Sequence, residues 1–415
     1  MMKKKYIILT NVIDSVGGAQ IYVRNKVKFL EELGWTVDVF YYGKGEVILS
    51  ELKRFKNNGI PFLRCYPQGY PRLRINRIID QILASTDKNE YNEIIVESHE
   101  IPLALWGELA AKRLNCKHII YLVQETFPTL SADIYEFFDF KHKRKELAGI
   151  SKTSLEMLFH GHKEIGDSEK YSLRAACSNA VDDVSNEIID NIVREDINIG
   201  CITRLDKPYV VPMANEIICF AENYKDKMIQ LVMVGSSVSG EVEKLILNKI
   251  KNIDNLKVLI TGYMFPIPRN LFEKIDLFIG VSGSANVSAA EGVLTLTLDV
   301  RDNKPMGLFG YDTDNNLFSD SKKDESISEM LQQILIEKKI APQTTQITIN
   351  DFRQVYKEHL AFINGSCEDK LYYDVKNLNI SLYDMAKKVT LGILGVNCYQ
   401  KLIDVRTRLH IHQIK

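Results

Sequence analysis

The chain has 415 residues, 45% of them apolar and 26% charged, with 23 Gly and 11 Pro. This is the composition of a globular protein and excludes collagen-like and disordered classes. At roughly 100–200 residues per domain, the length allows two domains or at most three. The 53 Lys and Arg residues nearly balance the 54 Asp and Glu residues, for a formal net charge of −1. Bulk nucleic acid is therefore not an expected partner.

The seven cysteines are scattered along the chain with no C-x-x-C pair. We therefore expect neither a zinc site nor a disulfide framework, and dispersed thiols fit a reducing cytoplasm. No stretch reaches the ~18 apolar residues that a membrane-spanning helix requires. The apolar run after the basic start is also too short for a signal peptide. These features predict a cytoplasmic protein that either stays in solution or sits on a membrane without crossing it.

The first half of the chain alternates short apolar runs with segments of helical periodicity. Residues 6–9 form a nearly continuous apolar run, as expected of a parallel strand covered on both faces. A glycine-bearing loop follows, and the next segment has apolar residues at helical spacing until Gly34. Further strands are predicted at 36–40, 94–97 and 119–123. This half is therefore predicted to consist of βαβ units.

The same alternation begins again after a polar stretch at 182–196. Strands are predicted at 199–202, 231–234, 258–260 and 277–279, and helices at 214–224 and 241–250. Two such series predict an α/β protein with two doubly wound, Rossmann-like domains that bind a ligand in the cleft beyond the carboxyl ends of their strands.

The predicted limits are 1–190 for the N-terminal domain and 191–365 for the C-terminal domain. Residues 366–415 are predicted to form a helical segment that packs back on the N-terminal domain. The residues that indicate this helix are apolar and recur at spacings of three and four: Leu382, Met385, Val389, Ile393 and Val396.

Two loops at predicted strand ends carry groups suited to an anion. Gly17 and Gly18 allow close backbone approach to a ligand before a helix N-terminus, although a simple two-glycine turn is an equal alternative. Arg204 and Lys207 follow the first strand of the second half and can hold a diphosphate. The alternative interpretation is a solvated pair of charges that flanks Asp206.

A third candidate loop is rich in small residues and comes after the strand at 277–279. Ser282, Gly283 and Ser284 precede a predicted helix and make a suitable cradle for phosphate or sugar hydroxyls, and Glu291 can accept hydrogen bonds from a ribose. The alternative is an ordinary helix cap followed by an exposed glutamate.

A histidine and an acidic pair are further candidates for chemistry. His99 closes a buried strand, so we expect its side chain to point into the cleft, with a structural hydrogen bond as the alternative. Asp312 and Asp314 form a D-x-D pair that can chelate a metal, but they lie among turn-forming residues, so a turn is the favoured interpretation.

Two basic stretches suggest contact with an anionic surface. Residues 53–77 contain seven Lys and Arg residues, no acidic residue, and several aromatic residues. Residues 141–145 form a second basic cluster after three phenylalanines. Basic residues beside aromatic ones suit an anionic membrane or a phosphate-bearing lipid, and a plain solvated face is the equal alternative.

In their order and position, the motifs across about residues 5–340 resemble those of the family 4 retaining glycosyltransferases, which have the two-domain GT-B fold. The motifs are Gly17-Gly18-Ala19-Gln20, His99-Glu100-Ile101-Pro102, Ile150-Ser151-Lys152, Asn179-Ala180-Val181-Asp182, Arg204-Leu205, Val234-Gly235, Thr261-Gly262-Tyr263 and Ile275-Asp276-Leu277-Phe278-Ile279.

The resemblance implies transfer of a sugar from a nucleotide-diphosphate donor, held mainly by the second domain, to an acceptor held mainly by the first. It also implies that fixed positive groups, and not an obligatory metal, stabilise the leaving diphosphate. We expect a UDP- or GDP-linked donor substrate and no metal or resident cofactor. The expected catalytic residues are His99 and Glu291, and the expected donor-binding residues are Gly17, Gly18, Arg204, Lys207, Gly235, Ser282, Gly283, Ser284 and Glu291.

Three positions depart from the family pattern. Tyr209 stands where the family has a lysine five residues after the arginine, so Lys207 is its substitute by proximity. The family's second histidine falls near Gln124, which cannot act as a general base. The family's two glutamates, eight residues apart, are reduced to Glu291, because Gly283 takes the place of the first.

We therefore expect a glycosyltransferase that builds a bacterial surface polysaccharide such as capsule, docks on the inner membrane leaflet and uses a lipid-linked or glycan acceptor. One alternative is a non-catalytic GT-B subunit that binds or stabilises a partner transferase. Another is a sugar-nucleotide epimerase on the same fold.

Overall fold

A computed structural model describes residues 3–11, 13–14, 16–43, 46–68, 70–124, 127, 129–237, 239–319, 321, 323–349, 351–379, 381–382, 384–393, 395, 398 and 401. The chain divides into two compact units. Unit 1 comprises Met1–Ser15, Tyr22–Ala176 and Asp351–Lys415, and unit 2 comprises Val16–Ile21 and Cys177–Asn350. These limits differ from the expected boundaries at 190 and 365.

Unit 1 is built on a five-stranded sheet in the order β2-β1-β3-β4-β5. All its strand pairs are parallel. Because both faces of such a sheet are covered, its strands are nearly continuous apolar runs, as the sequence indicated. The strands are β1 (Lys4–Leu9), β2 (Trp35–Phe40), β3 (Glu93–Ser98), β4 (Lys117–Leu122) and β5 (Leu147–Gly149).

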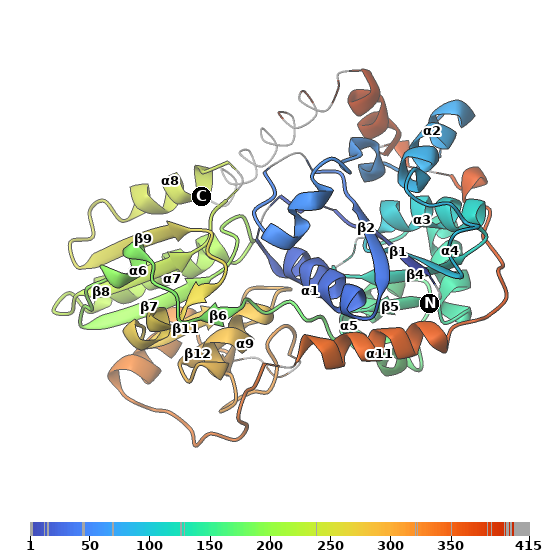
Figure 1. Cartoon of the computed structure of the whole chain (residues 1–415). Helices are drawn as coiled ribbons and strands as arrows, with labels where there is room; N and C mark the ends of the chain where they lie inside the picture. Colours follow the sequence, from blue (N-terminus) through green and yellow to red (C-terminus); the bar gives the residue numbers. More distant parts are fainter. Residues whose placement is uncertain are drawn as a thin grey trace. The chain divides into compact units, whose positions relative to one another are not determined.

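Helices connect these strands in the βαβ rhythm expected from the sequence (Figure 1). They are α1 (Gly18–Glu32), whose residues 18–21 are assigned to unit 2, α2 (Arg72–Leu83), α3 (Ile101–Leu114), α4 (Ala132–Lys143) and α5 (Lys152–Phe159). Local sequence features determine where several of these helices begin and end. A proline at the start of α3 suits the first helical turn, and Asn115 ends this helix in the left-handed conformation.

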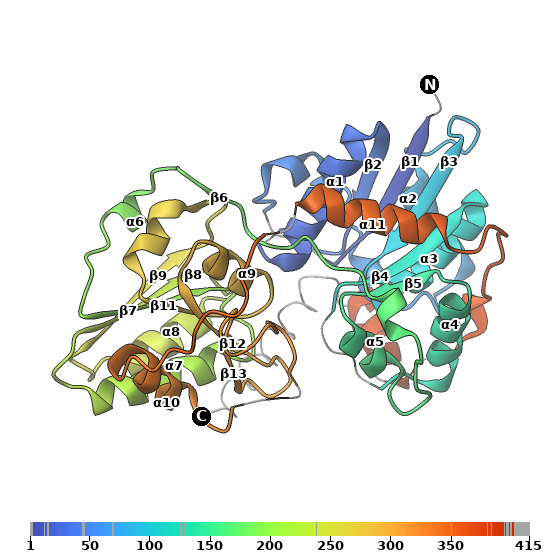
Figure 2. The ribbon, with the colours of Figure 1, turned by 90° about the horizontal axis from the view of Figure 1, so that it is seen from below.

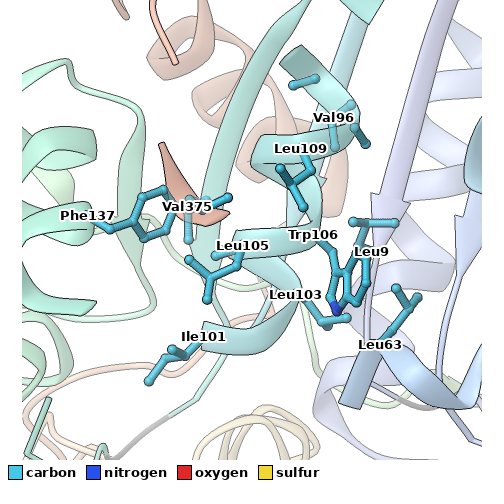
Figure 3. Close-up of a cluster of buried hydrophobic side chains, with 14 of the residues drawn as sticks. Leu9, Leu63, Val96, Ile101, Leu103, Leu105, Trp106, Leu109, Phe137 and Val375 are labelled. Atoms are coloured by element: carbon cyan, nitrogen blue, oxygen red, sulfur yellow. The ribbon is translucent and has the colours of Figure 1, made fainter. Parts of the chain in front are cut away.

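The core of unit 1 lies between α3 and the sheet (Figure 3). Trp106 is fully buried beside Leu9 and Leu63, and its indole nitrogen donates a 2.8 Å hydrogen bond to the carbonyl of Cys65. Val375, from the far end of the chain, packs in the same cluster as Phe137. The core of unit 1 therefore includes residues that return after unit 2.

The returning segment begins with α11 (Phe352–Asn364), which packs on α1 of unit 1 (Figure 2). The Tyr356 hydroxyl donates a 2.7 Å hydrogen bond to the carbonyl of Tyr22, and Arg353 pairs with Glu32 at 2.8 Å. The predicted helical segment at 366–415 therefore misses α11. Residues 382 and 384–393 are helical, and Val396 lies outside the described residues.

Unit 2 is built on a six-stranded sheet in the order β13-β12-β11-β7-β8-β9, in which only β13 is antiparallel. The strands are β7 (Ile197–Ile202), β8 (Ile229–Val234), β9 (Leu256–Gly262), β11 (Leu277–Gly280), β12 (Leu294–Leu298) and β13 (Pro305–Leu308). A separate pair is formed by β6 (Val181–Asp182) and β10 (Ile267–Pro268). The order reverses between β7 and β11, as in a doubly wound fold.

The helices of unit 2 are α6 (Glu187–Asp190), α7 (Val210–Asn223), α8 (Glu241–Lys249), α9 (Gly283–Ala290) and α10 (Ile327–Leu331). A capping box begins α10, where Ser326 and Glu329 satisfy each other's backbone N–H groups. Across the described part of both units, no helix combines the length and apolar character needed to cross a bilayer.

Candidate functional site

The candidate site lies at the carboxyl edge of the unit 2 sheet. β7 and β11 are neighbours and run parallel, so the loops that follow Ile202 and Gly280 leave the sheet at the same edge. This is the point where the strand order reverses, and ligands of doubly wound domains bind there. The two loops carry Arg204 and Ser282, two of the residues that the sequence singled out.

Arg204 lies within reach of the glycine loop that precedes α1. A side-chain carbon placed on Gly17 would lie 3.4 Å from Cδ of Arg204. The Arg204 side chain is about one third exposed, and its Nε atom lies 3.7 Å from Asp206. Lys207 lies in the same loop, where its backbone N–H donates a 3.2 Å hydrogen bond to the carbonyl of Arg204. The structure thus brings the predicted Arg204 and Gly17 together.

Two helices begin beside one another at this site, on either side of Cys177. A side-chain carbon on Gly18, the first residue of α1, would lie 3.4 Å from Cβ of Cys177. A side-chain carbon on Gly283, the first residue of α9, would lie only 2.9 Å from the carbonyl oxygen of Cys177. The first backbone N–H groups of a helix have no acceptor within the helix and carry partial positive charge. With Arg204, these two helix ends suit an anion.

Cys177 has no motif to mark it, and the sequence analysis did not select it. Its Sγ atom lies 4.0 Å from Oγ of Ser282, although the two residues are 105 positions apart. It enters the site because the segment that leads into unit 2 passes between the two helix starts. Such a contact has no signature in a local stretch of sequence.

Ser282 has a strained backbone at the turn from β11 into α9. Its φ of 55° and ψ of −124° lie in a region that non-glycine residues rarely adopt. The backbone N–H of Ser282 donates a 2.6 Å hydrogen bond to the carbonyl of Asn316, and the Asn316 side chain donates a 2.7 Å bond to Asn286 in α9. Asn316 therefore supports the turn, and the turn orients the Ser282 side chain.

Gly235 lies at the end of β8, where its loop approaches the loop of Arg204 so closely that no side chain fits. Its φ is +150°, and a side-chain carbon there would lie 1.7 Å from the carbonyl oxygen of Thr203, the residue before Arg204. The Thr203 hydroxyl lies 2.6 Å from the hydroxyl of Tyr209, which is buried. Tyr209 therefore braces the Arg204 loop instead of supplying a charge, as a lysine at this position would.

We expect Gly235→Ala to disturb the Arg204 loop and to destabilise unit 2. The new methyl group overlaps Thr203, and the resulting overpacking adds about 1–3 kcal/mol to the strain of the positive φ. Gly240→Ala is the matched control, because Gly240 also has a positive φ of 70° but open space around it. The control should cost only the backbone strain, about 1–2 kcal/mol.

Urea denaturation followed by far-UV circular dichroism measures both variants. Equal free energies of unfolding for Gly235→Ala and Gly240→Ala would show that the close approach to Thr203 is unimportant.

Comparisons with known proteins agree with this architecture. No protein-family model and no curated protein sequence matches the chain. Among solved structures, HepE from Anabaena in complex with UDP and glucose is similar with a TM-score of 0.59 at 12% identity, over 88% of this chain and 100% of HepE. HepE with UDP-glucose gives a TM-score of 0.57 at 12% identity, over 87% of this chain and 98% of HepE.

A candidate UDP-N-acetylglucosamine 2-epimerase from Listeria monocytogenes is also similar, with a TM-score of 0.51 at 14% identity, over 85% of this chain and 94% of the other. The fold is GT-B. This confirms the predicted α/β class with two Rossmann-like domains. At these identities the likeness shows the fold and leaves the activity to be argued from the site.

Within the GT-B fold, Glu291 lies at the edge of the unit 2 sheet opposite Arg204. It follows the last residue of α9, and a helix after a parallel strand runs back to the amino edge of the sheet. There Glu291 pairs with Arg269 and lines a cavity of about 480 Å³ together with Asp276, the residue before β11. The whole of α9 separates Glu291 from Ser282, so this geometry favours an ion-paired glutamate over a ligand pocket that the two residues share.

His99 is also placed differently from the expectation. It is fully buried in unit 1, where its Nε2 donates a 2.8 Å hydrogen bond to Glu97 and its Nδ1 lies 3.1 Å from the hydroxyl of Thr10. Both ring nitrogens are therefore occupied inside unit 1. This geometry favours the structural alternative over a side chain that points to a ligand.

Glu97 is the centre of the network that holds His99. It also accepts hydrogen bonds from Tyr6 at 2.5 Å and Tyr22 at 3.0 Å, and it forms an ion pair with Lys26. Burial alone raises the pKa of the Glu97 carboxyl, but Lys26 and His99 outweigh it and hold the pKa well below its usual range. The network joins β1, α1 and β3 through one buried carboxylate.

The same network reaches α11 through His359. Its Nδ1 lies 3.4 Å from the Tyr22 hydroxyl, and its Nε2 donates a 2.9 Å hydrogen bond to the carbonyl of Arg174. Burial and the nearby charge of Lys26 lower the pKa of His359 to about 3. His359 is therefore neutral at physiological pH and serves to anchor the returning helix.

Two of the four cations in the predicted basic surface at 141–145 are internal, and the other two are exposed. Lys141 is buried and pairs with Glu108 at 3.0 Å and Glu146 at 2.6 Å. Arg144 is also buried and pairs with Glu146 at 3.0 Å and with Asp369 at 3.1 Å. Lys141 and Arg144 therefore hold the end of α4 in place within unit 1, and they do not belong to a free cationic face.

The D-x-D pair is part of the turn after β13. The side chain of Asp312 accepts a 3.0 Å hydrogen bond from the backbone of Leu308. Within the described residues, no group of three or more His, Cys, Asp or Glu side chains is arranged to hold a metal ion.

Proposed function

We propose that the protein is a glycosyltransferase that takes a sugar from a nucleotide-diphosphate donor. The observation that carries the proposal is the meeting of Arg204 with the first turns of α1 and α9 where the strand order of the unit 2 sheet reverses. The diphosphate of a nucleotide-sugar is the natural ligand for such fixed positive groups. UDP is the favoured nucleotide, since the similar HepE structures contain UDP with glucose or UDP-glucose.

The site residues have clear roles in this reaction. When the bond between sugar and diphosphate breaks, negative charge develops on the leaving phosphate. Arg204 supplies planar N–H donors to the phosphate oxygens, and the backbone N–H groups at the starts of α1 and α9 add further donors. Lys207 supplies a second positive charge from the same loop. Because these groups are fixed by the fold, they stabilise the developing charge without moving.

We propose that the acceptor is a lipid-linked glycan used in bacterial surface polysaccharide synthesis, and that the enzyme works at the inner face of the plasma membrane. The family 4 resemblance of the motif series supports this role and a retaining outcome.

A second candidate function is sugar-nucleotide epimerisation. The similarity to the candidate UDP-N-acetylglucosamine 2-epimerase, which extends over 94% of that chain, favours this function.

A non-catalytic role beside a partner transferase is a third candidate. The position of Glu291 at the edge of the unit 2 sheet opposite Arg204 favours it, as does the engagement of both ring nitrogens of His99 within unit 1.

Thermal unfolding with UDP, GDP, ADP, CMP and dTDP tests the proposal. A ligand that binds only the folded state stabilises it by about 2.7 kcal/mol at one hundred times its dissociation constant. Both tryptophans, Trp35 and Trp106, lie in unit 1, so unit 2 must be followed by circular dichroism or dye binding. UDP is expected to raise the unfolding temperature of unit 2, and no response to any nucleotide would contradict the proposal.

Product analysis then separates the three candidates. The purified protein is incubated with a UDP-sugar, with and without a lipid-linked glycan acceptor. Transfer or slow release of the sugar supports a transferase, and an epimerised UDP-sugar formed without acceptor supports the second candidate. Binding without any product supports the third.

A further inference from the structure

The helix at 384–393 has two opposite faces of different character. Leu391 and Lys388 face inward and are buried, and Leu391 belongs to the core of unit 1. The other face carries four exposed apolar side chains. Their exposed fractions are 84% for Leu382, 47% for Met385, 50% for Val389 and 76% for Ile393. At 3.6 residues per turn, these four side chains form one narrow stripe opposite Leu391. Exposure of this apolar stripe to water is unfavourable, and burial against another apolar surface would lower the free energy.

Three contacts fix this helix beside the start of α2. The Lys387 ammonium donates a 3.1 Å hydrogen bond to the carbonyl of Arg64, and the Lys388 ammonium lies 4.6 Å from the ring centroid of Tyr70. A side-chain carbon on Gly392 would lie 3.6 Å from a terminal nitrogen of Arg74. In Figure 1 the dark red helix accordingly lies next to α2. Its orientation is therefore set by unit 1.

The start of α2 adds an exposed leucine and exposed arginines to this region. Leu73 is 82% exposed, and Arg72 and Arg77 are exposed on the same helix. The acidic residues of the two helices are engaged locally: Asp80 lies 3.6 Å from Arg113, and Asp384 accepts a 2.6 Å hydrogen bond from Ser381. The exposed apolar side chains are therefore bordered by cations.

We propose that this surface binds an anionic lipid bilayer. It is defined by the apolar residues Leu73, Leu382, Met385, Val389 and Ile393 and by Arg72 and Arg77, and it is called the lipid-binding surface below. An amphipathic helix that lies in the plane of a membrane buries its apolar stripe at the headgroup boundary, while flanking cations bind anionic headgroups.

Charge favours a bilayer over a second copy of the chain as the occupant. The charged residues of the lipid-binding surface, Arg72 and Arg77, are both exposed and both cationic. Two copies that met through this surface would bring like charges together, whereas an anionic bilayer attracts them. The surface therefore matches lipid in both its apolar and its charged parts.

This surface uses one end of the basic stretch at 53–77 that the sequence suggested, since Arg72, Leu73 and Arg77 belong to that stretch. The aromatic side chains of Phe55 and Tyr70, within the basic stretch at 53–77, are buried. They cannot enter a bilayer, and the exposed apolar side chains come from Leu73 and the 384–393 helix instead. The inference rests on the proposed work at a membrane, but lipid binding is measurable without sugar transfer.

Flotation of the full-length protein with vesicles tests the proposal. The vesicles consist of phosphatidylcholine alone or of phosphatidylcholine with phosphatidylglycerol, at low and at physiological salt. We expect binding to the anionic vesicles that weakens as salt rises. The double variant Leu382→Gln/Ile393→Gln should lower the partition coefficient by about tenfold or more.

The matched control is Val193→Gln/Leu247→Gln, which changes two exposed apolar side chains of unit 2 and should bind vesicles like the unchanged protein. Unchanged flotation of the Leu382→Gln/Ile393→Gln variant, or failure of the unchanged protein to bind anionic vesicles, overturns the proposal. So does sedimentation that shows a dimer which this variant converts to a monomer.

Stabilisation by UDP, measured on the same samples, separates this inference from the proposed function. A variant that responds to UDP but not to vesicles is folded, so its failure to float reports on the lipid-binding surface. If the unchanged protein responds to UDP and does not float, the lipid-binding surface alone is refuted. If it floats and does not respond to UDP, the proposed donor site fails and the lipid-binding surface stands.

Discussion

Arg204→Ala is expected to lower the affinity for UDP by about 10- to 100-fold. A hydrogen bond to a charged group contributes about 1.5–3 kcal/mol, and each 1.4 kcal/mol corresponds to a tenfold change in affinity. The side chain is partly exposed, and its ion pair with Asp206 is long at 3.7 Å, so its removal should leave the fold nearly unchanged. Isothermal titration calorimetry with UDP measures the change. Arg204→Lys should retain part of the affinity, since it keeps the charge and loses the planar donors.

The chain offers a matched control for this experiment. Arg269 is another partly exposed arginine of unit 2, but it pairs with Asp183 and Glu291 at the opposite edge of the sheet. Arg269→Ala and Glu291→Gln should leave the affinity for UDP unchanged. If either weakens UDP binding as much as Arg204→Ala does, the site is not at the carboxyl edge of the sheet.

Lys26→Met is expected to destabilise unit 1 by about 3–5 kcal/mol, because it leaves the buried Glu97 carboxylate without its ionic partner. Both side chains are only 1% exposed, so water cannot replace the lost charge. Trp35 and Trp106 both belong to unit 1, and their fluorescence follows the unfolding of this unit in urea. The double variant Lys26→Met/Glu97→Gln should recover much of the loss, since it removes both charges.

The control for this prediction is an exposed ion pair in the same sheet. Lys4 pairs with Glu93 at 2.8 Å, and both side chains are more than one third exposed. Lys4→Met should cost at most about 1 kcal/mol. Equal losses for Lys26→Met and Lys4→Met would show that burial of the Glu97 network does not matter.

The Glu97 network also explains why His99 could not be interpreted from the sequence. A histidine at the end of a strand is compatible with a ligand contact or with a buried hydrogen bond. The choice depends on Glu97 and Thr10, and these partners depend on the pairing of β1 with β3. Strand pairing is a long-range property, so the motif around His99 does not contain it.

Glu291 shows a different limit of sequence analysis. Its separation from Ser282 in the sequence is short, and this suggested a shared pocket. The eight residues of α9 lie between them and carry Glu291 to the other edge of the sheet. At about 1.5 Å per residue, such a helix spans roughly 12 Å. The length and direction of the helix therefore decide which side chain reaches the site.

The sequence by itself determined the α/β class, the two series of βαβ units, and the positions of the Arg204 and Ser282 loops at strand ends. These features are local, because apolar periodicity and glycine breaks are visible within ten to twenty residues. Tertiary structure alone decided that Cys177 lies between two helix starts, that Lys141 and His99 are internal, and that the stripe from Leu382 to Ile393 is exposed. Each of these depends on a partner distant in the chain, and a periodic pattern shows that a helix has an apolar face without showing what covers it.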